Sequence, residues 1–436
     1  MVRHKNRIDR LRASSRRRDQ NGGSGRLAEM SARLDTKRIA SMARRPVFNS
    51  SLEVVAYEIV LGAGPIRSIA SSDAGGGSKL LVNSVLEADV AALSDAKPVH
   101  LTVLPSAIEA GLPPELIPEG TILVICSNAE PTPATFAAVE EVRNRGFRIV
   151  LDDLTANPRL HPLLRLAYGV KVNIGSSVGP SPSRQMSALK TAGIELIADG
   201  VKSYDDLRCA KTLGFTQFQG SFLSKPDGLG DEQASAAQLG SLELVTLLQN
   251  PDADISDIAA VIRRDVNLSY RILKVVNSAR YSLSRPLESI EEAVVLVGTR
   301  QIVSWVGMMG MSGVNNKPDE LTRTAMVRAR VCETLAGRLG RSDARRFYLV
   351  GLFSVIEALL DIPAEQALRR LPLAPEIIDA ITAGRGVMGE VMRAVIAHEG
   401  GDWARAQVSG LEDWAMSDAF QTAMVEVDRT WAKIAP

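Results

Sequence analysis

Between residues 41 and 228, two patterns of hydrophobic and polar positions alternate along the chain. Short apolar or β-branched runs are separated by longer stretches in which apolar residues recur at helical spacing. The runs occupy residues 52–57, 99–103, 121–125, 148–151, 169–172 and 194–198. Six such strands in series predict parallel βαβ units, arranged either as a closed barrel or as a doubly wound sheet. One intervening helix is well marked, because Phe136, Val139 and Val142 recur at threes and Gly146 follows as a stop.

The pattern changes after residue 228. Residues 229–240 are rich in Gly, Asp, Ser, Ala and Gln, a composition typical of a linker. Beyond it the strand pattern disappears, and apolar residues recur at helical spacing near residues 258–262, 268–276 and 290–297. Ser256 is expected to cap the first of these helices and Gly298 to end the third. Residues 241–436 are therefore predicted to form an all-α bundle.

Charge is distributed unevenly, although the formal net charge is only +1. Fourteen of the 51 basic residues and four of the 50 acidic residues lie within residues 1–45. Residues 1–40 also contain few large apolar side chains, so we predict that they form a disordered basic tail. Two interpretations stay open: a weak contact with nucleic acid, an anionic surface or an acidic partner, or a solvated tail.

The cysteines and the apolar segments bear on the compartment. Cys126, Cys209 and Cys332 are far apart and form no CxxC or Cys/His cluster, so neither a disulfide framework nor a zinc site is expected. The N-terminal segment lacks the apolar run of a signal peptide, and no long apolar run suggests a transmembrane segment. We expect a cytoplasmic protein.

Several motifs of the first domain occur in one order: Glu58-Ile59-Val60, then residues 151–154, 170–173, 197–202 and 213–220. With this order and spacing, residues 41–228 resemble the EAL family. The resemblance implies a TIM-like (β/α)8 barrel that hydrolyses cyclic di-GMP with two divalent metals. In such a barrel the motifs lie at the carboxyl ends of the strands, where barrel enzymes assemble their sites.

The resemblance also implies a remnant ligand site. Its members here are Glu58, Asp152, Asp153, Lys171, Asp199 and Gln219. The chain departs from the family pattern at several positions: His100 replaces an Asn, Asp199 a longer acid, and Val124, Ser127, Lys202 and Gly62 replace a Glu, two further acids and an Arg.

These departures predict that catalysis has been lost. Two hard cations need a cluster of oxygen ligands, and Val124 can bind no metal. Lys202 adds positive charge to the same rim, and Gly62 removes a ligand-holding Arg. No catalytic residue and no metal are expected. Other roles stay open for the remaining residues: turn or cap formation for Asp152 and Asp153, a mutual ion pair for Glu58 and Lys171, a hydrogen-bonded structural role for His100, and a tight turn for Gln219.

The second domain carries motifs of its own. Residues 265–269, 273–279 and 285–290 resemble the HDOD family, whose helical domains are relatives of metal-dependent HD phosphohydrolases. Where a His-Asp pair would lie, the chain has Ser354 and Val355, which cannot build a metal site. Asn277 and Ser278 are interpreted as a helix C-cap or as a partner-contact loop. The remaining apolar cluster is interpreted as core or as a groove for a partner helix, and it comprises Trp305, Met308, Met309 and Met311.

The combined architecture resembles the EAL-HDOD proteins of bacterial signalling. It implies a non-catalytic regulatory protein that binds another signalling protein in a pathway linked to cyclic di-GMP, and no cofactor is expected. One alternative is a sensor that binds cyclic di-GMP without hydrolysis. Another is a residual phosphodiesterase that uses Glu58, Asp152 and Asp153 with Mg²⁺ or Mn²⁺.

Overall fold

A computed structural model describes most of the chain from residue 42 to residue 434. The described residues are 42–61, 94–95, 97–103, 105–109, 117, 120–125, 131–152, 158–174, 182–228, 236–248, 254–278, 285–312 and 317–434. The predicted disordered tail, most of the predicted linker, and Gly62, Ser127 and Asp153 lie outside these residues.

Eight strands close into a barrel in chain order, which decides between the two predicted architectures. The strands are β1 (Met42–Asn49), β2 (Val54–Leu61), β3 (Val99–Val103), β4 (Ile122–Ile125), β5 (Arg148–Asp152), β6 (Gly169–Asn173), β7 (Glu195–Val201) and β8 (Gln217–Gly220). From β2 to β8 each neighbouring pair is parallel, as the predicted βαβ units require.

Strand β1 departs from the expected pattern, because it pairs antiparallel with both β2 and β8. Neither β1 nor β8 was among the predicted strands. The middle of β1 contains two charged residues and a proline, Arg44-Arg45-Pro46, and β8 carries Phe218 as its one large apolar side chain. Both sequences therefore lack the continuous apolar run by which the other strands were found.

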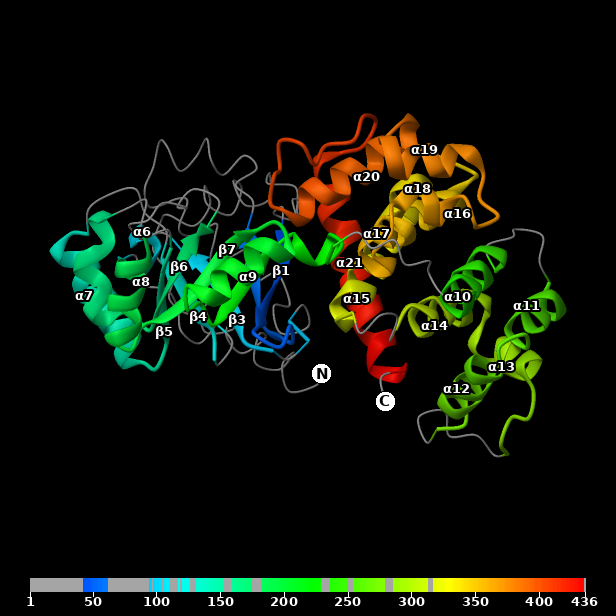
Figure 1. Cartoon of the computed structure of the whole chain (residues 1–436), viewed down its shortest axis with the longest axis horizontal. Coiled ribbons are helices and arrows are strands. Elements are labelled where there is room, and N and C mark those ends of the chain that lie inside the picture. The colour runs from blue at the N-terminus through cyan, green and yellow to red at the C-terminus, as the bar shows by residue number, and fades with distance from the viewer. Residues whose placement is uncertain are drawn as a thin grey trace, which may run out of the picture. The chain divides into compact units, whose positions relative to one another are not determined.

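Helices accompany the strands along the described part of the barrel. They are α6 (Pro105–Glu109), η2 (Pro158–Leu166), η4 (Phe222–Ser224), α7 (Pro133–Asn144), α8 (Pro182–Thr191) and α9 (Tyr204–Thr212). Helix α7 packs against β5, and α8 and α9 pack against β7 (Figure 1). Capping boxes at Thr132 and Ser203 begin α7 and α9, and these satisfy backbone N–H groups that the first helical turn leaves unpaired.

The second half of the described chain is helical, as predicted. Its elements are α10 (Ala236–Leu247), α11 (Ile255–Ile262), α12 (Val266–Val276), α13 (Ile290–Val297), α14 (Thr299–Met311), α15 (Asp319–Arg338), α16 (Ala344–Phe353), α17 (Ile356–Leu360), α18 (Ala364–Leu368), α19 (Pro375–Ala383), α20 (Gly386–Glu399) and α21 (Asp413–Ile434). Gly298 ends α13 as expected, whereas α11 is capped by Asp254. The predicted cap, Ser256, lies inside α11, because Asp254 and Asp257 complete a capping box two residues earlier.

Most helices of this half pack into one apolar core. Trp305, Met308 and Met311 on α14 are almost completely buried in it. This position identifies the aromatic and Met cluster as core packing, so it is not a groove. No single described helix is long and apolar enough to cross a membrane; α13 and α14 pass that test only as a pair bent by 116°.

Candidate functional site

The candidate site lies in the barrel mouth and begins with the pairing of β1 and β2. Side chains of a strand alternate between two faces, so adjacent residues point in opposite directions. Arg45 on β1 is paired with Glu58 on β2, and Glu58 is in turn paired with His100 on β3. Register thus brings three strands' polar side chains together although they are distant in sequence.

Glu58 is the centre of a buried ionic network. Its carboxylate accepts hydrogen bonds from Lys171 Nζ at 2.7 Å, from Thr102 Oγ1 at 3.0 Å and from Arg45 Nη1 at 3.2 Å. The Glu58 and Lys171 side chains are only 2% and 3% exposed. The ion pair that sequence reasoning left open is therefore formed.

The network decides the protonation of its members. Burial alone would raise the pKa of Glu58, but the charges of Lys171 and Arg45, with hydrogen bonds from Lys171 and Thr102, outweigh it and lower the pKa to about 2. Burial lowers the pKa of Lys171, yet the negative charges of Glu58, Asp199 and Asp152 dominate and raise it. Glu58 is thus a carboxylate and Lys171 an ammonium at neutral pH.

Arg45 is the site residue that the sequence analysis missed. Its guanidinium donates to Asp199 Oδ1 at 2.6 Å as well as to Glu58, so it links β2 with β7 across the mouth. Lys171 Nζ also lies 3.7 Å from Asp199 Oδ2. Arg45 had been counted with the basic N-terminal segment. The available signal was the amphiphilic stretch Met42–Phe48, whose apolar ends flank the two arginines.

The other predicted site residues follow the strand ends. Asp152 ends β5 and is paired in register with Lys171, and the Asp152 charge contributes to raising the pKa values of both Lys171 and Arg45. Gln219 lies in β8 and is almost fully buried. The neighbouring Gly220 lets β7 and β8 approach closely, since a Cβ there would lie 2.0 Å from Val201 O. Asp153 is outside the described residues.

Among the described barrel residues, three buried polar side-chain atoms have no hydrogen-bond partner: His100 Nε2, Gln217 Oε1 and Gln219 Nε2. Burial lowers the pKa of His100 to about 4 although the Glu58 charge acts in the opposite direction, so the imidazole is neutral. A neutral His and two Gln side chains leave hydrogen-bonding capacity for a polar guest, including water.

The substituted positions lie in different surroundings. Val124 is fully buried in a small apolar cluster with Ile122, Val150 and Ile197. It therefore supports barrel packing at a position where the resemblance places a ligand. Lys202 is exposed, and its backbone N–H donates to Asp206 in the α9 cap. The positive charge that lies against the acids belongs to Arg45 and Lys171.

The described donor set does not fit two divalent metals. Among the described residues, no group of three or more His, Cys, Asp or Glu side chains is placed to hold a metal ion. Both Glu58 oxygens accept hydrogen bonds from cationic or hydroxyl donors, and Asp199 is bound by Arg45. A hard cation would have to displace these donors to reach the acids.

The helical half also has an arginine at the position where the family resemblance would place metal ligands. Arg328 on α15 donates to Ser354 Oγ at 3.2 Å, at the position where a His-Asp pair would lie. It also forms hydrogen bonds of 2.7 to 3.0 Å with Glu399 and one of 3.3 Å with Ser224. Val355 is buried.

Asn277 and Ser278 form a helix end. Asn277 is the C-cap of α12, its side chain donates to Leu287 O and accepts from Leu287 N, and Ser278 Oγ donates to Val275 O. These hydrogen bonds support the cap interpretation.

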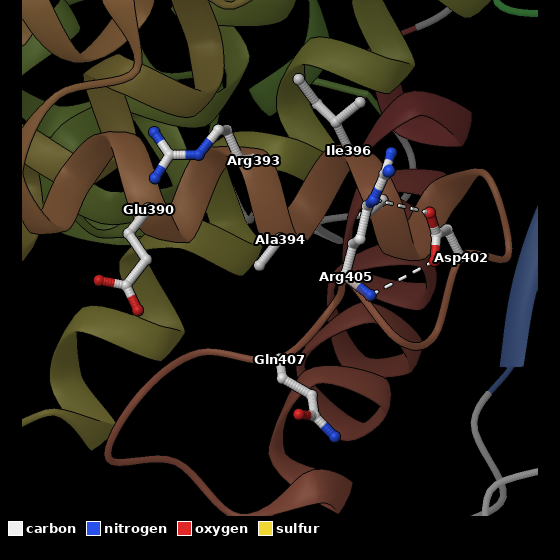
Figure 2. A pocket seen from close by; sticks show the side chains of 8 residues that line it. Glu390, Arg393, Ala394, Ile396, Asp402, Arg405 and Gln407 are labelled. Carbon is white, nitrogen blue, oxygen red and sulfur yellow. Dashed lines mark hydrogen bonds and ion pairs between the residues drawn. The ribbon is translucent and has the colours of Figure 1, made fainter.

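A surface hollow lies beside α20 in the helical half. It has a volume of about 530 Å³, and Figure 2 shows side chains from α20 and the following loop around it. Arg405 pairs with Asp402 there at 3.6 Å. None of the predicted site residues lines this hollow.

Comparisons with known proteins agree with the two-part architecture. Residues 241–364 match the HDOD domain family. The chain is 27% identical to the uncharacterized protein YuxH of Bacillus subtilis, over 83% of this chain and 91% of that protein. It is 25% identical to the cyclic di-GMP phosphodiesterase CdgJ of Vibrio cholerae, over 92% of this chain and 94% of that protein.

A crystal structure of an EAL domain protein from Listeria monocytogenes is 11% identical and covers 47% of this chain and 93% of its own, with a TM-score of 0.37. That similarity is too low to support a functional conclusion. The predicted order, an eight-stranded barrel followed by a helical region that contains an HDOD domain, is confirmed.

Proposed function

We propose that this protein is a non-catalytic regulator in cyclic di-GMP signalling that acts by binding another protein. The observation that carries the proposal is the pair of internal cations, Arg45 and Lys171, bound to Glu58 and Asp199. Similarity to CdgJ, named as a cyclic di-GMP phosphodiesterase, supports the link to this nucleotide.

Electrostatics makes metal binding at these acids unfavourable. A divalent cation that replaced Arg45 at Glu58 and Asp199 would lie close to the Lys171 ammonium, and like charges at such distances repel strongly in a buried site. The guanidinium would also need new partners. Val124 adds no oxygen ligand to offset these costs.

A sensor function is the second candidate, because the mouth keeps polar groups that could receive a nucleotide. Gln219 Nε2 and His100 Nε2 are buried without partners, and Arg45 carries a positive charge that is 23% exposed. Phosphate groups are commonly bound by guanidinium and amide donors. Binding of this kind requires no metal.

Calorimetry with cyclic di-GMP, with and without Mn²⁺ or Mg²⁺, and a turnover assay on the full chain test these functions together. The regulator proposal expects no turnover under any condition. Hydrolysis that depends on Mn²⁺ or Mg²⁺ and is abolished by Asp152→Asn would overturn it in favour of a residual phosphodiesterase. Metal-independent binding that is weakened by Gln219→Met, with no turnover, would identify the sensor.

A further inference from the structure

The β1–β2 ribbon has two functional faces, and its second face lies against the helical half. Arg44 and Arg45 are adjacent on β1, and Tyr57 and Glu58 are adjacent on β2. Because neighbouring strand residues point to opposite faces, Arg45 and Glu58 enter the barrel mouth while Arg44 and Tyr57 point away from it.

The outward pair is buried in a second ionic network. Arg44 Nη1 donates to Asp428 Oδ2 on α21 at 2.5 Å, and its guanidinium lies 4.3 Å from the centre of the Tyr57 ring. Tyr57 Oη donates to Glu320 Oε2 on α15 at 2.9 Å. Arg323 on α15 donates to Asp428 Oδ1, also at 2.9 Å.

A third helix binds the same strand. His398 on α20 forms a 2.8 Å hydrogen bond with Met42 O, and its ring stacks on Phe420 of α21. Both α20 and α21 lie beyond residue 364, where the HDOD match ends. The C-terminal segment thus supplies contacts to the barrel that the HDOD domain alone would not provide.

Disturbing either ionic network, the one around Glu58 or the one around Arg44 and Asp428, should cost folding free energy. Breaking a buried ion pair leaves an uncompensated charge, and close-packed surroundings do not absorb small displacements. Burial raises the pKa of Glu320, although Arg44, Arg323 and the Tyr57 hydroxyl act against this. A bound ligand that separates Arg45 from Glu58 and Asp199 would therefore strain β1, because the preceding residue, Arg44, is held by Asp428 of α21.

From this juxtaposition we infer that the β1–β2 ribbon is a relay, through which a change at Arg45 and Glu58 in the barrel mouth alters the packing of α15 and α21. The relay would let a change in the barrel mouth reach the helices, as the proposed regulatory function requires. Its biological role rests on that proposed function. Its existence can be tested without metal, nucleotide or activity, so the two ideas can fail separately.

Hydrogen–deuterium exchange of the full chain with Arg45→Met is the test. The relay predicts at least about fivefold faster exchange in peptides that cover residues 319–328 and 424–434, as well as in the mouth. The matched control is Arg148→Met. Arg148 begins β5, at the end of the strand opposite to Asp152, and its guanidinium contacts the Tyr168 ring instead of the mouth acids. It should leave those helix peptides unchanged.

Coupling between two sites is reciprocal, so the experiment can be reversed. Asp428→Asn should speed exchange in β1, β2 and the mouth, whereas Asp418→Asn, which removes an Arg partner elsewhere on α21, should not. Faster exchange confined to the barrel for Arg45→Met, or to the helices for Asp428→Asn, would overturn the relay, and so would equal effects of the controls. If Arg45→Met does not fold, Arg45→Lys is judged by the same criteria.

Discussion

The barrel mouth and the Arg328 cluster both place an arginine where the family resemblances suggest metal chemistry, but they do so differently. In the mouth the acids Glu58 and Asp199 remain and share Arg45 and Lys171. In the helical half Ser354 stands in place of a ligand, and Arg328 pairs with Glu399. The mouth thus keeps acids that are bound by internal cations, whereas the helical half has a serine at a position where the resemblance places a ligand.

The two clusters also differ in how completely they satisfy their polar groups. The mouth contains buried atoms of His100 and Gln219 without partners, whereas Arg328 donates to acceptors on three residues, Glu399, Ser354 and Ser224. Glu399 is 22% exposed and keeps access to water. We therefore expect the mouth to be the more sensitive of the two to loss of a charge.

Among the substitutions that test this comparison, removal of the Lys171 charge should lower the free energy of unfolding most. Lys171→Met leaves the buried Glu58 carboxylate with Arg45 and Thr102 alone, and we expect a loss of about 4 kcal/mol in the free energy of unfolding measured by urea titration. The double variant Glu58→Gln, Lys171→Met should recover a large part of the loss. No recovery would show that the pair's charges are not the cause.

Each region also contains a buried histidine, and acid should destabilise both. Burial lowers the pKa of His100 and, despite the hydrogen bond to Met42 O, that of His398, each to about 4. The unfolded chain binds these protons near pH 6.5, so stability is complete above that pH and is lost as the pH falls toward 4, by up to about 3 kcal/mol for each histidine.

Urea titrations at several pH values test this expectation. His100→Asn and His398→Asn should each reduce the slope of stability against pH between pH 6.5 and pH 4. An unchanged slope in both variants would rule out the histidines as its source. The lowered pKa of Glu58 adds a separate loss as the pH falls from 4.5 toward 2, and that loss should persist in both variants.

Arg328→Met should cost less than Lys171→Met. The remaining Glu399 carboxylate can hydrate, so we expect a loss of about 2 kcal/mol in the free energy of unfolding. Arg385→Met, which removes an exposed arginine paired with Asp379 at 3.7 Å, is the matched control and should have little effect. A cost for Arg328→Met equal to that of Lys171→Met would contradict the distinction between the two clusters.

Lys202→Glu should have the smallest effect. The side chain is exposed, so we expect a change below about 0.5 kcal/mol in stability and no gain in Mn²⁺ binding by calorimetry. Arg45→Met, which frees Glu58 and Asp199 of one cation, should bind Mn²⁺ more tightly than Lys202→Glu does. The reverse order would show that the rim charge, and not the internal one, opposes metals.

Local patterns were sufficient for much of the fold. Apolar runs marked six strands, helical spacing and Gly146 marked α7, and Gly298 marked the end of α13, because these features depend on neighbours within one or two turns of chain. The sequence pattern did not predict β1 and β8, because barrel closure, and not a continuous apolar run, stabilises these two strands. The domain limits of 41–228 and 241–436 stay predictions.

By itself, the sequence determined which acids remain near the carboxyl strand ends and that Val124 can bind no metal, since residue identity decides both. Only the tertiary structure decided what surrounds those acids. Arg45 reaches Glu58 and Asp199 because β1 runs antiparallel and closes the barrel, and the same pleat turns Arg44 toward Asp428, almost four hundred residues away. Such contacts arise from strand register and domain packing, which no local pattern contains.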